Sequence, residues 1–169
     1  CRICRLWVRP TPRSRASIRL SIKFNDGVQF DLLFYDEYVI GHLLDECIRW
    51  TVATILESKD EPALIEFITL HWFQPYGPPR VLIMDGERGL NAEGSLQWLG
   101  HWGVSRIQRA PEQHAQLVER HQDILRTTLH RTSSQIKEEG FMDLTKRSNM
   151  KLVLAEAVLA KNCLLSVHG

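Results

Sequence analysis

Two aspartates stand out in this sequence because each lies in or beside an apolar run. Asp31 stands between Phe30 and Leu32 in the run VQFDLLFY, where burying a carboxylate is costly unless it is paired or bound to a metal ion. Asp85 follows the run RVLIM and precedes Gly86, at the end of a predicted buried strand, where sites in open α/β sheets usually lie. Ordinary structural roles also fit each aspartate taken alone, because strand aspartates commonly pair with arginine and Asp-Gly pairs commonly form turns.

A third acid, Glu119, lies in a long predicted helix, on a line with Gln122 and Arg126 that points away from the packed face. That packed face is expected to comprise Leu117, Val118, His121, Ile124, Leu125 and Thr128. Helical glutamates are nearly always solvated, so neither spacing nor composition selects Glu119. Three carboxylates that converged on one point would repel each other and bind hard divalent cations.

The elements that must position these residues follow from the hydrophobic periodicity after Phe24. Short apolar and β-branched runs predict strands at 28–35, 39–44, 51–56, 80–84 and 104–107. Helical spacing predicts helices from Ser58 or Asp60 to about Tyr76, and at 92–102, 113–137 and 150–167. A three-strand antiparallel meander followed by alternating helices and strands predicts a ribonuclease-H-like α/β sandwich, a five-stranded mixed sheet flanked by helices.

The 169-residue chain has the composition of one globular domain, with 44% hydrophobic and 24% charged residues. No uncharged apolar run reaches the roughly 18 residues that a membrane helix needs, and the start shows no signal-peptide pattern. We therefore expect an intracellular protein, nuclear or cytoplasmic, without membrane contact. Because the chain starts with Cys1 and ends inside an apolar helical pattern, we also expect it to be part of a longer protein.

Basic residues are concentrated at the start of the chain. Residues 1–23 carry seven basic side chains and no acidic one, whereas the remaining residues carry 14 basic and 20 acidic side chains. This distribution predicts a basic linker at 1–23 and a mildly acidic domain at 24–169. Phosphate contact and plain solvation of the linker both fit its composition.

Three blocks of sequence, in order, resemble the integrase catalytic core of retroviruses and long-terminal-repeat retrotransposons. FDL at 30–32, followed by LLDECIRW at 43–50, resembles the first two strands of that family, with its first catalytic aspartate. YGPPRVLIMDGE at 76–87 resembles the strand that carries the second aspartate, and QHAQLVER at 113–120 resembles the motif whose Val-Glu-Arg triplet supplies the glutamate. The resemblance covers about residues 24–168.

The resemblance implies a DDE-type integrase with Asp31, Asp85 and Glu119 as its catalytic residues. Such an enzyme trims the ends of retroelement DNA and joins them to target DNA by transesterification. Asp31 would bridge two Mg²⁺ or Mn²⁺ ions, and the other two acids would each complete one ion. Mg²⁺ is favoured because the site has only oxygen ligands.

The same resemblance implies partners. Double-stranded DNA would be contacted by Arg126, Arg120 and Lys23, and we expect self-association into a homo-oligomer. Cys1 and Cys4 resemble the CxxC half of the zinc-binding module that precedes this core, so Zn²⁺ would bind only in a longer parent protein. Cys47 and Cys163 are predicted to be buried thiols.

Two alternatives stay open. A ribonuclease-H-like nuclease shares the fold and the carboxylate chemistry, and its usual fourth acid would have to come from Asp123 or Glu112. A catalytically decayed or co-opted DNA- or protein-binding module is the other alternative. It fits the 33 residues between Asp85 and Glu119, slightly fewer than is usual in the family, and the absence of the family's Gly and Asn beside the Val-Glu-Arg triplet.

Overall fold

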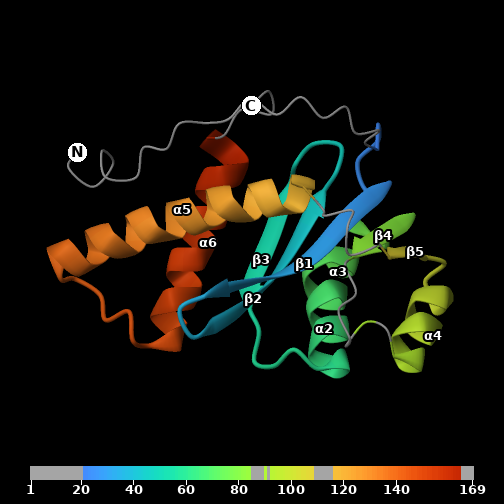
Figure 1. The fold of residues 1–169 in the computed structure, drawn as a ribbon, viewed down its shortest axis with the longest axis horizontal. Coiled ribbons are helices and arrows are strands. Elements are labelled where there is room, and N and C mark those ends of the chain that lie inside the picture. Colours follow the sequence, from blue (N-terminus) through green and yellow to red (C-terminus); the bar gives the residue numbers. More distant parts are fainter. Residues whose placement is uncertain (1–20, 85–89, 91, 109–115, 165–169) are drawn as a thin grey trace.

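A computed structural model describes residues 21–84, 90, 92–108 and 116–164 of the chain (Figure 1). Its centre is a five-stranded sheet with the strand order β3-β2-β1-β4-β5. The antiparallel meander comprises β1 (Gly27–Tyr35), β2 (Tyr38–Asp45) and β3 (Thr51–Ile55). Two further strands, β4 (Val81–Met84) and β5 (Ser105–Gln108), run parallel to β1. The predicted ribonuclease-H-like arrangement, with its mixed sheet, is confirmed.

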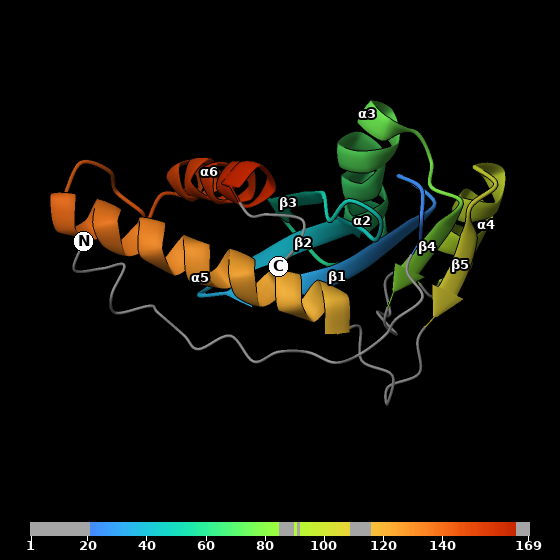
Figure 2. The same ribbon diagram turned by 90° about the horizontal axis from the view of Figure 1, so that it is seen from above.

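Helices cover both faces of the sheet (Figures 1 and 2). One face carries α5 (Gln116–Glu139) and α6 (Arg147–Leu164). The other carries α2 (Glu61–Ile68), its continuations η1 (Thr69–Phe73) and α3 (Gln74–Tyr76), and α4 (Glu93–His101). Within the described part of the chain, none of these helices is both long enough and apolar enough to cross a bilayer.

The two-residue alternation of β1 divides its side chains between the two helical layers. Val28, Phe30 and Leu32 belong to the apolar cluster on the α2 side, which also contains the fully buried Trp72. Leu33 and Tyr35 belong to the cluster under α5 and α6, with Leu125 and Leu129 of α5 among its members. Asp31 therefore faces α5, although both of its chain neighbours face α2.

The helix predicted from residue 58 or 60 begins at Glu61, because Asp60 caps it: its side chain accepts a hydrogen bond of 3.1 Å from the N–H of Ala63. A π-helical turn, η1, follows α2 and was not predicted. The buried pair Phe67-Ile68 recurs five residues later as Trp72-Phe73. A turn with i→i+5 hydrogen bonds suits that spacing, because it returns the chain to the same face after five residues.

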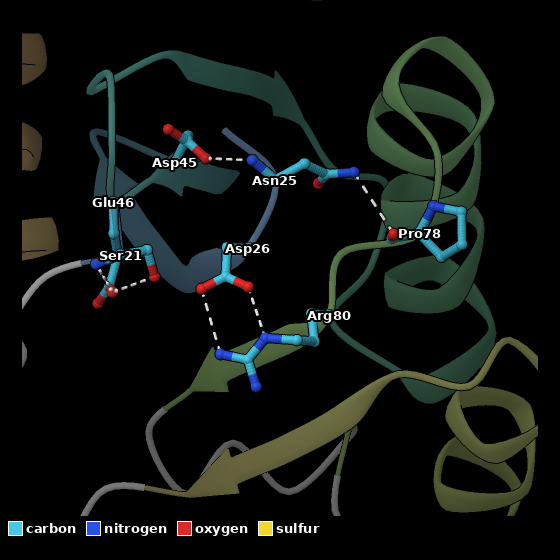
Figure 3. Close-up of polar contacts among 7 residues, drawn as sticks. All are labelled: Ser21, Asn25, Asp26, Asp45, Glu46, Pro78 and Arg80. Carbon is cyan, nitrogen blue, oxygen red and sulfur yellow. Dashed lines mark hydrogen bonds and ion pairs between the residues drawn. The ribbon is translucent and has the colours of Figure 1, made fainter. Parts of the chain in front are cut away.

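A polar corner fixes the start of β1 against the β2–β3 turn and α3 (Figure 3). Asp45 is fully buried, and its carboxylate accepts hydrogen bonds from the backbone N–H groups of Asn25 (2.8 Å), Cys47 (3.0 Å) and Ile48 (2.7 Å). Asn25 has a φ of 64° and donates from its side chain to the carbonyl of Tyr76 (3.0 Å). Asp45, an acid at the end of a strand, therefore has a structural role here.

Candidate active site on β1 and α5

Asp31 lies in the middle of β1, half-buried, and both of its carboxylate oxygens are engaged. Oδ1 accepts the backbone N–H of Leu32 at 2.8 Å, and Oδ2 accepts Nε2 of Gln122 at 2.9 Å. Because one donor lies on each oxygen, these two bonds orient the carboxylate. The carboxylate is therefore held in a fixed orientation between β1 and α5.

Glu119 lies in the first turn of α5 and is exposed. It precedes Gln122, the residue that contacts Asp31, by three positions, which places the two side chains on neighbouring positions of one helix face. Three residues correspond to a rise of about 4.5 Å along the helix axis. The structure thus places Glu119 about one helical turn from the contact between α5 and Asp31.

Asp85, the third predicted acid, lies outside the described residues. The described part of β4 nevertheless shows how this strand is aligned with β1. Met84, which directly precedes Asp85, pairs with Phe30, which directly precedes Asp31, in the parallel ladder between β4 and β1. The described end of β4 therefore lies level with Phe30, the residue directly before Asp31.

The described acids fit a hard divalent cation by their chemistry. Asp31 and Glu119 offer carboxylate oxygens, which Mg²⁺ and Mn²⁺ prefer. Within the described ranges no three side chains of the types that bind metals gather at one point, and Asp85 stands outside those ranges.

The floor of the site beside Asp31 contains neutral imidazoles. His42 is the cross-strand partner of Asp31 on β2 and is fully buried. Burial, with smaller contributions from Lys161 and His121, lowers the pKa of His42 to about 3. The pKa of His121 on α5 is also lowered to about 3, mainly by burial and then by the positive charges of Lys161, Arg49 and Arg120. At neutral pH both rings are therefore uncharged.

Lys161 of α6 is the buried cation of this region, with 4% of its surface exposed. Its Nζ donates to the backbone carbonyl of Arg49 at 3.1 Å. Burial, followed by the charge of Arg49, lowers the pKa of Lys161 to about 8. The positive charge beneath the β2–β3 turn at neutral pH thus comes from lysine and arginine.

Two glutamines in this region escaped the sequence analysis. Gln122 was predicted to point away from the packed face, and that prediction was wrong: only 7% of its surface is exposed. The buried line of α5 runs instead through Val118, Gln122, Leu125 and Leu129, because these positions face β1. Gln29 is 1% exposed and lies two residues before Asp31, on the same face of β1. The sequence signal that could have identified Gln29 was a polar residue within the apolar run of β1.

The basic residues predicted to bind DNA are spread over two elements. Arg120 on α5 is exposed, as is Lys23 in the turn before β1. Arg126 forms an ion pair with Asp123 on the same helix, with 2.8 Å between Nη1 and Oδ1.

Of the four cysteines, the structure describes two, and neither belongs to a group of side chains that could hold a metal ion. Cys1 and Cys4 lie outside the described residues. Cys47 is half-buried and Cys163 is exposed, and both are free thiols. The prediction that Cys163 is buried was wrong, because the solvent side of α6 carries this residue.

Comparison with known proteins identifies the type of fold. No protein-family model matches the sequence, and no curated protein matches it. The structure is similar to the catalytic core domain of BIV integrase, with a TM-score of 0.68 and 15% sequence identity over 84% of this chain and 86% of that one. The chain therefore has the ribonuclease-H-like fold of an integrase core, as the three sequence blocks predicted.

Proposed function

We propose that this chain is a DDE-type polynucleotidyl transferase, the core of an integrase that joins retroelement DNA ends to target DNA. One observation carries the proposal: Asp31, on the central strand of an integrase-like fold, is held by Gln122, one helical turn from Glu119. Asp85 completes the set in this proposal. The register of β4 with β1 supports its placement beside Asp31.

Asp31, Asp85 and Glu119 would hold two Mg²⁺ or Mn²⁺ ions. When bound, such a pair activates the attacking oxygen and stabilises the leaving oxygen of a phosphodiester. The attacking oxygen belongs to water during trimming of the DNA end and to a DNA 3′-hydroxyl during joining. Within the chain, the N–H of Leu32 and the amide of Gln122 hold the Asp31 carboxylate in place for this role.

Double-stranded DNA would lie along α5, where the exposed Arg120 can meet a phosphate. Arg126 would exchange its partner Asp123 for a phosphate when DNA binds, and Lys23 would add a contact from the start of β1. Phosphate contacts of this kind carry no sequence preference, so affinity is expected to fall as the salt concentration rises.

A ribonuclease-H-like nuclease is the nearest alternative, and its fourth acid distinguishes it. Asp123 is exposed and engaged with Arg126, which argues against a place among the metal ligands. Glu112 lies outside the described residues. The described part of α5 therefore favours a three-acid site, as in a transferase.

The test is Mg²⁺- or Mn²⁺-dependent joining of an oligonucleotide duplex, together with the reverse, disintegration reaction on a branched duplex. We expect product from the native chain, and none from Glu119→Gln or when the metal is chelated. Glu138→Gln, an exposed position near the far end of α5, is the matched control and should keep native activity.

The alternatives give different products. Cleavage without joining in both assays would indicate a nuclease. Absence of both reactions in a folded chain that binds Mn²⁺ would indicate a decayed or co-opted module. Activity that survives Glu119→Gln would contradict the proposed role of Glu119.

A further inference from the structure

We propose that Gln29 and Gln122 are positioning residues that together set the separation of Asp31 from Glu119. The inference rests on the proposed function, because it concerns the carboxylates that would hold the metal ions. Each buried glutamine links β1 to α5 by a hydrogen bond. Gln29 binds the backbone of Val118, directly before Glu119, and Gln122 lies three residues after it. The two links therefore flank Glu119 along the helix.

The first link uses a backbone group that the helix itself leaves unpaired. The N–H of Val118 belongs to the first four of α5, which lack partners within the helix. Oε1 of Gln29 accepts it at 3.2 Å, and Nε2 of Gln29 donates to Oε1 of Glu46 at 2.6 Å. A flipped amide would turn its NH₂ towards the N–H of Val118 and its oxygen towards the carboxylate, so only one orientation satisfies both partners.

Glu46 is itself held in place. It is 5% exposed, and its Oε2 accepts the hydroxyl of Ser21 at 3.1 Å, which Figure 3 shows together with the contact to the Ser21 backbone. A hydrogen-bonded chain thus runs from Ser21 through Glu46 and Gln29 to the first turn of α5. Buried networks that are satisfied in this way are rigid, so the first link is a firm one.

The second link acts on the carboxylate directly. Nε2 of Gln122 donates to Oδ2 of Asp31 at 2.9 Å, while the N–H of Leu32 holds Oδ1 at 2.8 Å. The donor, Gln122, lies on the same helix as Glu119. The acceptor, Asp31, is the acid that is proposed to bind metal together with Glu119. This bond therefore couples the position of α5 to the orientation of the Asp31 side chain.

The two hydrogen bonds between β1 and α5 are separated by nearly the same distance along the strand and along the helix. From Gln29 to Asp31 a strand advances about 6.7 Å, and from Val118 to Gln122 a helix rises about 6 Å. A third contact continues the register, because the hydroxyl of Tyr35 lies 3.2 Å from Nδ1 of His130.

That third contact lies further along both elements. From Gln29 to Tyr35 the strand covers about 20 Å, and from Val118 to His130 the helix covers about 18 Å. Figure 1 shows α5 and β1 running in nearly the same direction. A shift of α5 by one turn would break all three contacts, so the register fixes how far Glu119 lies from Asp31 along the sheet.

The test compares Gln122→Met with the native chain. Methionine matches the length of glutamine, suits a buried site and removes the amide that donates to Asp31. We expect the Mn²⁺ affinity and the metal-activated joining rate to fall roughly 10- to 100-fold, as is typical for residues that orient metal ligands. Affinity for duplex DNA and the thermal unfolding midpoint should stay close to native. Gln135→Met, on the exposed end of α5, is the matched control and should change none of these quantities.

Mn²⁺ affinity is measured by titration calorimetry on each variant, independently of DNA joining. If the native chain joins DNA and Gln122→Met has native Mn²⁺ affinity and native rate, the positioning role is overturned while the proposed function stands. If the native chain binds Mn²⁺ but joins no DNA, the proposed function fails. Weaker Mn²⁺ binding by Gln122→Met then still supports the positioning role, and equal binding overturns it.

The Gln29 link has its own measurement, because a substitution there would leave the buried Glu46 carboxylate without its donor and endanger folding. In the native chain, the amide hydrogen of Val118 should exchange with solvent as slowly as amides inside α5. Exchange as fast as that of an unprotected first-turn amide would overturn the role of Gln29.

Discussion

Replacing Asp31 by asparagine should abolish DNA joining and, at the same time, leave the fold as stable as the native one or more stable. A bridging carboxylate contributes several kcal/mol of charge stabilisation through its metals, and each 1.36 kcal/mol is tenfold in rate, so we expect a loss of at least about 10³-fold. Asparagine keeps the shape and can hydrogen-bond both Leu32 and a rotated Gln122 amide. If Asp31, Asp85 and Glu119 converge as proposed, removing one of three like charges should also relieve the repulsion between them.

The loss of activity and the change in stability can both be measured on the same purified Asp31→Asn protein. Mn²⁺ at ten times its dissociation constant should raise the free energy of unfolding of the native chain by about 1.4 kcal/mol, because it binds only the folded state. The Asp31→Asn chain should show no such increase in chemical denaturation. A variant that keeps both its Mn²⁺-dependent stabilisation and its joining activity would remove Asp31 from the site.

Acid should destabilise this fold well before its carboxylates are protonated. The pKa of His42, ordinarily 6.5, is about 3 in the folded chain because the ring is buried, and that of His121 is lowered to a similar value. Well above pH 6.5 both rings are neutral in the folded and unfolded states, so they add no pH dependence. Below it, the unfolded chain binds protons that the folded chain does not, and stability is lost at about 1.4 kcal/mol per pH unit for each ring. Between pH 6.5 and pH 5 the expected loss is about 1.7 kcal/mol per histidine, or about 3.3 kcal/mol together.

Urea unfolding across this pH range measures the effect. His42→Gln should remove about half of the pH dependence, and the double change with His121→Gln should remove most of it. His101→Gln, at an exposed position at the end of α4, is the matched control and should keep the native slope. A native chain with constant stability from pH 6.5 to pH 5 would contradict the burial of both neutral rings.

The sequence was sufficient for the sheet and for the place of Asp31 within β1, because both depend on local patterns. Alternation and β-branched runs define β1, β2 and β3, and an acid inside such a run is visible without any structure. Glu119 was accessible only through the Val-Glu-Arg resemblance, because a carboxylate on a helix surface has no local signature. Its place one turn from the Asp31 contact depends on how α5 is set against β1.

The two glutamines show where sequence reasoning stops. Apolar side chains at Leu117, Val118, Ile124 and Leu125 are compatible with two adjacent faces of α5, and the apolar pattern placed Gln122 outside the packed one. The helix is rotated so that Gln122 lies against β1, where its hydrogen bond to Asp31 compensates for burying an amide. A rotation of this size is decided by tertiary packing and hydrogen bonds across elements.

The most direct test of the three-acid site is the Mn²⁺-dependent disintegration of a branched duplex by the Asp85→Asn chain. Asp26→Asn is its matched control, because Asp26 is an aspartate beside the same strand pair, at the opposite end, where it pairs with Arg80 (Figure 3). If Asp85 completes the site with Asp31 and Glu119, the Asp85 variant should lose at least about 10³-fold in rate while the Asp26 variant keeps native activity. An Asp85→Asn chain that resolves the branched duplex at the native rate would contradict the three-acid site.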